Sequence, residues 1–141
     1  MAWVAYQRDD YEQMLTHYQE LSTLAKKRKV PHYQAESQVG VALAQALAIH
    51  QRGEVDIASS IDYIESEPNL LIPDSPFRLH LLCYHLLTLI NDPYTETLVR
   101  IADAQLQDLA SLIEDEIWRE SYLENVPEHR AIIRLYTGIE G

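Results

Sequence analysis

The chain has 141 residues, 47% of them apolar, and a formal net charge of −11 at pH 7. This length suits one domain with its own core, and the acidic balance argues against partners that present phosphates, namely nucleic acid or an anionic membrane. The single cysteine excludes a disulfide framework within the chain, and the scarcity of Gly and Pro favours long helices. The N-terminus has neither a basic flank nor a long apolar run, so we expect a cytoplasmic protein.

Apolar residues recur at steps of three and four along most of the chain, which predicts an all-α fold. The expected helices cover about 1–7, 11–29, 33–51, 54–67, 77–90 and 94–117, followed by two short helices split at 125–127. Asp10 supplies an N-cap for the second helix, and the basic run 26–29 suits its C-terminus. Residues 31–33 are expected to form a turn, and Gly40 permits close approach of a neighbouring helix.

The helix expected over residues 77–90 is apolar on more than one face, so it is predicted to be central to the fold. One seam consists of Leu79, Leu82, Leu86 and Leu89, and a second of Leu81, Leu87 and Ile90. The helix expected over 94–117 has the acidic run 114–116 near its end, where negative charge is unfavourable. Either the helix bends there or a neighbouring element supplies cations.

Tight turns at residues 8–11, 52–55 and 91–94 start about 40 residues apart, a period typical of stacked helical hairpins. Small residues lie around the second turn, at Ala46, Gly53 and Ala58. In these features the chain resembles a tetratricopeptide-type repeat. The resemblance implies a short right-handed solenoid of antiparallel hairpins over residues 1–117, within a single domain that spans 1–141.

The tail has a more particular pattern in Arg119, the pair Tyr122 and Leu123, and the run 124–127, which reads Glu-Asn-Val-Pro. It resembles the closing segment of tetratricopeptide arrays in bacterial signal-transduction ATPases, repeat-bearing transcriptional activators and cyclases. The resemblance implies that residues 118–141 cap the array and that the parent protein is longer. An apolar face on the last hairpin of a solenoid would need such a cover.

No motif for catalysis, cofactor binding or metal binding is present. His80 and His85 are five residues apart, which does not place them on one helical face, and no Gly-rich phosphate loop or nucleophile elbow occurs. Cys83 lies within an apolar helix and is interpreted as an inert core residue. We therefore predict no catalytic residue, no metal and no cofactor.

The predicted function is a non-catalytic protein-interaction or sensing module that buries a partner segment in a groove. The candidate partner-binding residues are Tyr6, Gln38, Gln45, Arg78 and His85. Trp3 and Tyr6 also suggest an open N-terminal end through which the chain self-associates or packs on further repeats. The alternative is a small-molecule sensor or a small helical enzyme with a pocket beside the 77–90 helix.

Overall fold

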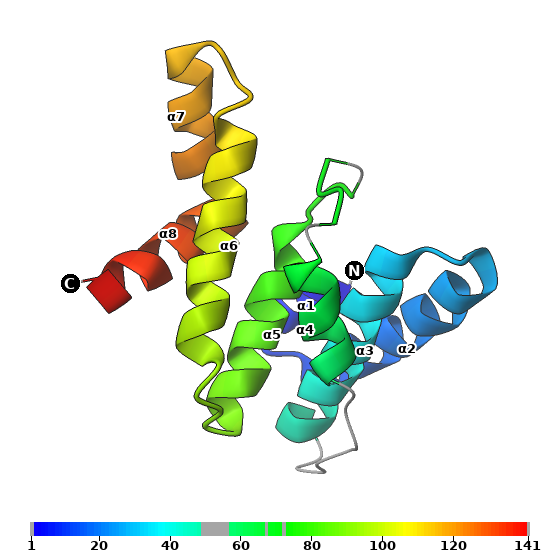
Figure 1. Cartoon of the computed structure of the whole chain (residues 1–141). Helices are drawn as coiled ribbons and strands as arrows, with labels where there is room; N and C mark the ends of the chain where they lie inside the picture. Colours follow the sequence, from blue (N-terminus) through cyan, green and yellow to red (C-terminus); the bar gives the residue numbers. More distant parts are fainter. Residues whose placement is uncertain (1, 49–56, 67, 72, 141) are drawn as a thin grey trace. The chain divides into compact units, whose positions relative to one another are not determined.

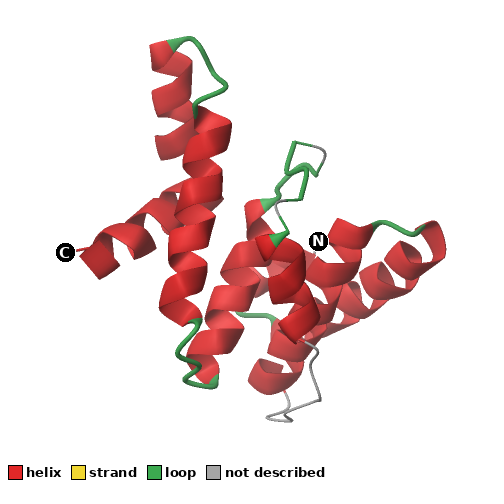
Figure 2. Cartoon of the chain, in the orientation of Figure 1, coloured by secondary structure: helices red, strands yellow, loops and turns green. Residues whose placement is uncertain are grey.

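The structure is a computed structural model that describes residues 2–48, 57–66, 68–71 and 73–140 (Figure 1). These residues form eight helices and no strand (Figure 2), which confirms the all-α class. The helices are α1 (Ala2–Gln7), α2 (Tyr11–Arg28), α3 (Pro31–Ala48), α4 (Ile57–Glu65), α5 (Phe77–Leu89), α6 (Thr95–Ala110), α7 (Glu116–Glu124) and α8 (Pro127–Glu140). The chain divides into two compact units, residues 1–86 and 87–141. The predicted turn at 52–55 lies outside the described residues.

The start of α3 differs from the prediction of a turn over residues 31–33. The helix begins at Pro31, and the backbone N–H of Gln34 already donates to the carbonyl oxygen of Val30. Proline suits the first helical position because its missing N–H would have no partner there and its φ is preset. The prediction of a turn was therefore wrong, and Pro31 starts a helix.

The predicted helix over residues 94–117 ends early, at Ala110. A side-chain oxygen of Asp115 accepts a hydrogen bond from the backbone N–H of Trp118, which caps the start of α7. The acidic run 114–116 thus lies at a helix N-terminus, where the backbone dipole stabilises negative charge. The sequence left open whether the helix bends at this run or a neighbouring element supplies cations. In the structure the helix ends before the run.

Three helices in the described residues end in a left-handed residue that is not glycine. The residues are Asp9, Lys29 and Asn91, with φ of 59°, 55° and 53°. After each, the next backbone N–H bonds to a carbonyl five residues back, as for Val30 and Ala25 (3.1 Å), which is the Schellman arrangement. Side chains other than Gly strain this conformation, least so for Asn and Asp. Lys29 is therefore the most strained of the three.

We expect Lys29→Gly to raise the free energy of unfolding by about 1 kcal/mol, because glycine removes the left-handed strain. Lys27→Gly, within the last turn of α2, is the matched control and should lower it by about 0.5–1 kcal/mol. Urea unfolding of both variants measures the two changes. A loss of stability in both would contradict strain at Lys29.

The contact between α2 and α3 is the most extensive helix pairing in the described residues. It depends on Gly40, because a Cβ there would lie 2.5–2.7 Å from three ring atoms of Tyr18. The Tyr18 ring thus lies against the backbone of α3, and its side chain is 1% exposed. Gly40 does permit the close helix approach that the sequence predicted.

We expect Gly40→Ala to lower the free energy of unfolding by about 1–3 kcal/mol, since the Tyr18 ring must move. Gly138→Ala in α8 is the control, because its added methyl would meet no atom within 4 Å. The control should be stabilising by about 0.5–1 kcal/mol through helix propensity alone. Equal thermal stability of Gly40→Ala and the wild type would mean that the ring does not require this glycine.

In the second unit, α7 runs back beside α6, and α8 crosses α6 (Figure 1). Ile132 of α8 is fully buried, whereas α7 contributes no fully buried side chain. The tail predicted to begin at residue 118 therefore starts inside α7, and α8 supplies most of its packing. Arg119 fixes the connection between α6 and α7 by donating from Nη2 and Nε to the carbonyl oxygen of Ile113, at 2.6 and 2.9 Å.

The predicted two-sided burial of the helix at 77–90 is observed along most of α5. Leu79, Leu82 and Leu86 of the first seam and Leu87 of the second are buried, Leu81 is half-buried, and Leu89 and Ile90 are each 40% exposed. These two residues lie where α5 ends and the chain turns. Among the described helices, none is both long and apolar enough to cross a membrane.

Candidate binding pocket

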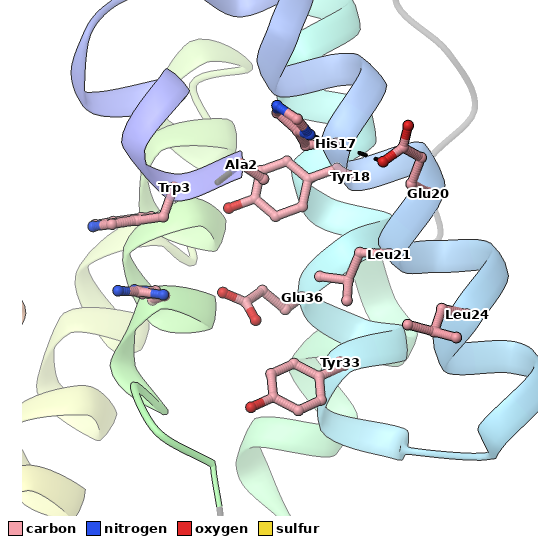
Figure 3. Close-up of a pocket in the computed structure, with 10 residues that line it drawn as sticks. Ala2, Trp3, His17, Tyr18, Glu20, Leu21, Leu24, Tyr33 and Glu36 are labelled. Atoms are coloured by element: carbon pink, nitrogen blue, oxygen red, sulfur yellow. Dashed lines mark ion pairs between the residues drawn. The ribbon is translucent and has the colours of Figure 1, made fainter.

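A pocket of about 370 Å³ lies within the first unit (Figure 3). Four helices contribute to it, because α1, α2, α3 and the first turn of α5 all supply side chains. The lining residues are Ala2, Trp3, His17, Tyr18, Glu20, Leu21, Leu24, Tyr33, Glu36 and Arg78. Aromatic and leucine side chains make up half of these residues, and His17, Glu20, Glu36 and Arg78 add polar groups, a combination also found in ligand pockets.

Tyr18 brings a hydroxyl group to the pocket that has no hydrogen-bond partner among the described residues. Burial, together with the nearby Glu36, raises the pKa of Tyr18 well above its ordinary value, so the hydroxyl stays protonated. A buried polar group without a partner costs about 1–3 kcal/mol. The hydroxyl therefore retains its capacity to donate and to accept a hydrogen bond, although its oxygen is covered by the surrounding atoms.

Glu36 places a carboxyl group in the pocket although its residue is only 5% exposed (Figure 3). Burial raises the pKa of Glu36 to about 7, and the positive charges of Arg78 and of the N-terminal amine oppose this shift without cancelling it. Near neutral pH the carboxyl group therefore exists in both protonation states. Perturbed acids in pockets mark candidate functional sites, because structure alone seldom favours a buried, poorly compensated charge.

Arg78 extends over the indole ring of Trp3, with its guanidinium carbon 5.5 Å from the ring centroid. Trp3 in turn packs against Tyr6, with ring centroids 5.2 Å apart. The guanidinium thus has a cation–π contact on one wall of the pocket. This contact also joins α1 to α5.

Tyr6 and His85 form a hydrogen bond between the hydroxyl group and Nδ1. Burial raises the pKa of Tyr6 to about 12 and lowers the pKa of His85, so both groups are neutral at pH 7. The tautomer of His85 determines which of the two groups donates. A neutral pair of this kind attaches α1 to α5 and supports the Trp3 wall from behind.

The structure brings together three of the five residues predicted to bind a partner. Arg78 lines the pocket, and Tyr6 and His85 support its wall. Gln38 and Gln45 lie elsewhere on α3, the first exposed and the second half-buried, and neither is among the lining residues described. Partner binding by all five residues remains a prediction.

Sequence reasoning missed Glu36 and Tyr18 as site residues. Glu36 lies three positions before Val39 and seven before Leu43, so it shares a helical face with buried residues. An acid on an apolar helical face was a usable signal. Tyr18 lies four positions after Met14 and three before Leu21, a spacing that predicts burial, but spacing cannot show that a buried hydroxyl lacks a partner.

The remaining groups with catalytic or ligating potential are elsewhere. Cys83 is fully buried, as predicted, and burial raises its pKa to about 12, so its thiol is protonated at neutral pH. In the part of the chain that the structure describes, no three His, Cys, Asp or Glu side chains are grouped so as to hold a metal ion.

A second surface feature lies in the other unit, where α6 turns into α7. Leu112, Ile117 and Trp118 are strongly exposed there, and Trp118 reaches 73%. Large apolar side chains gathered within seven residues of a surface turn are typical of protein contact sites.

Trp3, by contrast, is buried within the chain, so it does not form the open N-terminal end that the sequence suggested.

Comparisons with protein-family models, with curated proteins and with solved structures find no match to this chain.

The pKa of Glu36 yields a prediction on stability. The pKa of Glu36 is raised from 4.5 to about 7 in the folded state. The contribution of this group to the free energy of unfolding is therefore largest below about pH 4.5 and is lost as pH rises toward 7. Glu36→Gln should therefore leave stability nearly unchanged at about pH 4 and raise it by roughly 3 kcal/mol at about pH 8. Glu20→Gln, at an exposed carboxylate, is the control and should change little at either pH. Denaturant unfolding at the two pH values provides the measurement, and a constant difference between Glu36→Gln and wild type would refute the buried charge.

Proposed function

We propose that this chain is a non-catalytic protein-interaction module that binds a segment of a partner through the pocket in residues 1–86. The observation behind this proposal is the convergence of aromatic walls on two poorly compensated polar groups, Tyr18 and Glu36. These groups cost folding free energy and would regain interactions on binding. The exposed side chains around Trp118 provide a separate contact surface that supports the same function.

We also propose that the hairpins belong to a right-handed solenoid of tetratricopeptide type. Two features support it: α2 and α3 pair across a tight turn, and α7 runs back along α6. In this proposal the chain is the C-terminal repeat domain of a larger cytoplasmic signalling or regulatory protein from bacteria. The resemblance of the tail around Arg119 to closing segments of such arrays is its basis. Self-association through the N-terminal end also remains a proposal, and the buried Trp3 does not support it.

A small-molecule sensor is the second candidate, because the pocket has the right size and place. Its volume of about 370 Å³ falls within the range of roughly 300–1,000 Å³ usual for ligand sites. It also lies beside the start of α5, and the alternative drawn from the sequence has its pocket beside the 77–90 helix. In this reading the ligand fills the pocket alone, with no partner segment.

Photo-crosslinking in cells of the source organism distinguishes the two candidates. Benzoylphenylalanine placed at Leu24, which lines the pocket and is 46% exposed, should capture one protein partner. The matched control is the same group at Leu71, which is 68% exposed but does not line the pocket, and it should capture none. Adducts are identified by mass spectrometry. Equal capture at both positions would contradict the interaction module, whereas no protein adduct together with a small molecule retained in native mass spectrometry would favour the sensor.

A further inference from the structure

The polar interior of the pocket offers acceptors for a ligand that donates hydrogen bonds. The Glu36 carboxyl group and the Tyr18 hydroxyl group point from α3 and α2 toward the same space (Figure 3). Tyr18 is 1% exposed, and its hydroxyl has no partner in the described part of the chain. A protonated amine or guanidinium has only donors and would satisfy both oxygens.

The apolar walls of the pocket suit the methylene stem of a basic side chain. Leu21 and Leu24 provide apolar contact of the kind that the methylene stems of Lys and Arg prefer. Tyr33 adds aromatic surface, whereas the ring of Trp3 is already in contact with the guanidinium of Arg78. A basic side chain therefore matches the pocket along its whole length.

The net charge of the chain favours a cation over an anion. Glu36 and Glu20 both line the pocket, and the positive charges of Arg78 and of the N-terminal amine act on Glu36. The whole chain has a net charge of −11, which draws basic segments and repels acidic ones.

We infer that the pocket binds a lysine or arginine side chain of a partner segment, with its stem along Leu21 and Leu24 and its charged head between Glu36 and Tyr18. The inference rests on the proposed function for the existence of a partner segment. It adds the chemistry by which that segment is recognised.

The test uses the full chain with Trp118→Phe, which leaves Trp3 as the only one of the two tryptophans and makes its fluorescence a reporter of the pocket. The probe is a capped alanine pentapeptide with lysine at its centre. Its matched controls carry norleucine, which has a similar stem without the charge, or glutamate. We expect the lysine peptide to bind with a dissociation constant on the order of 1 mM and the two controls at least tenfold more weakly.

Three variants locate the contact. Glu36→Gln should weaken binding of the lysine peptide at least tenfold, whereas Arg78→Gln should tighten it because a competing positive charge is gone. Tyr18→Phe retains the ring against Gly40, so it should fold with equal or higher stability and still bind several-fold more weakly. Circular dichroism checks that each variant is folded.

Several results would overturn the inference. These are preferred binding of the glutamate peptide with loss in Arg78→Gln, equal binding of the norleucine peptide, and no response of Trp3 to any peptide. Butylamine binding as tightly as the lysine peptide would overturn the assignment to a peptide segment. Failure here together with a protein adduct at Leu24 would reject only the basic side chain, whereas absence of that adduct would reject the interaction module itself.

Discussion

The close contact between the Tyr18 ring and the backbone at Gly40 is the constraint on which the first unit depends. It sets the separation of α2 and α3, because any larger residue at position 40 would push the ring away. That separation places the Tyr18 hydroxyl and the Glu36 carboxyl group in one pocket. The same glycine thus determines both the packing of the hairpin and the position of its unsatisfied hydroxyl.

Helix content could be predicted from the sequence because apolar spacing repeats over many residues. The end of α2, the approach at Gly40 and the burial of Cys83 all followed from local patterns. Errors occurred where one residue type has two roles. Pro31 is compatible with a turn or a helix start, and the acids at 114–116 either weaken the end of one helix or begin the next.

The candidate site was only partly predictable, for a physical reason. Arg78 stood out because a charge interrupts an apolar helix. Tyr6 and His85 are linked to it through Trp3, which contacts both Arg78 and Tyr6. The state of Glu36 and Tyr18 depends on what four different helices place around them. Desolvation of a carboxyl group and the absence of a partner for a hydroxyl are properties of the assembled pocket, and no window of sequence contains them.

The two donations from Arg119 to the carbonyl oxygen of Ile113 have a consequence for Trp118 beside it. They tie the first turn of α7 to the end of the connection from α6, and the backbone N–H of Trp118 is itself bonded to Asp115. The backbone that bears the exposed indole is thus already ordered before any contact forms. A partner that covers this side chain would lose little backbone entropy in doing so, which is how a small preorganised anchor gains affinity without a large interface.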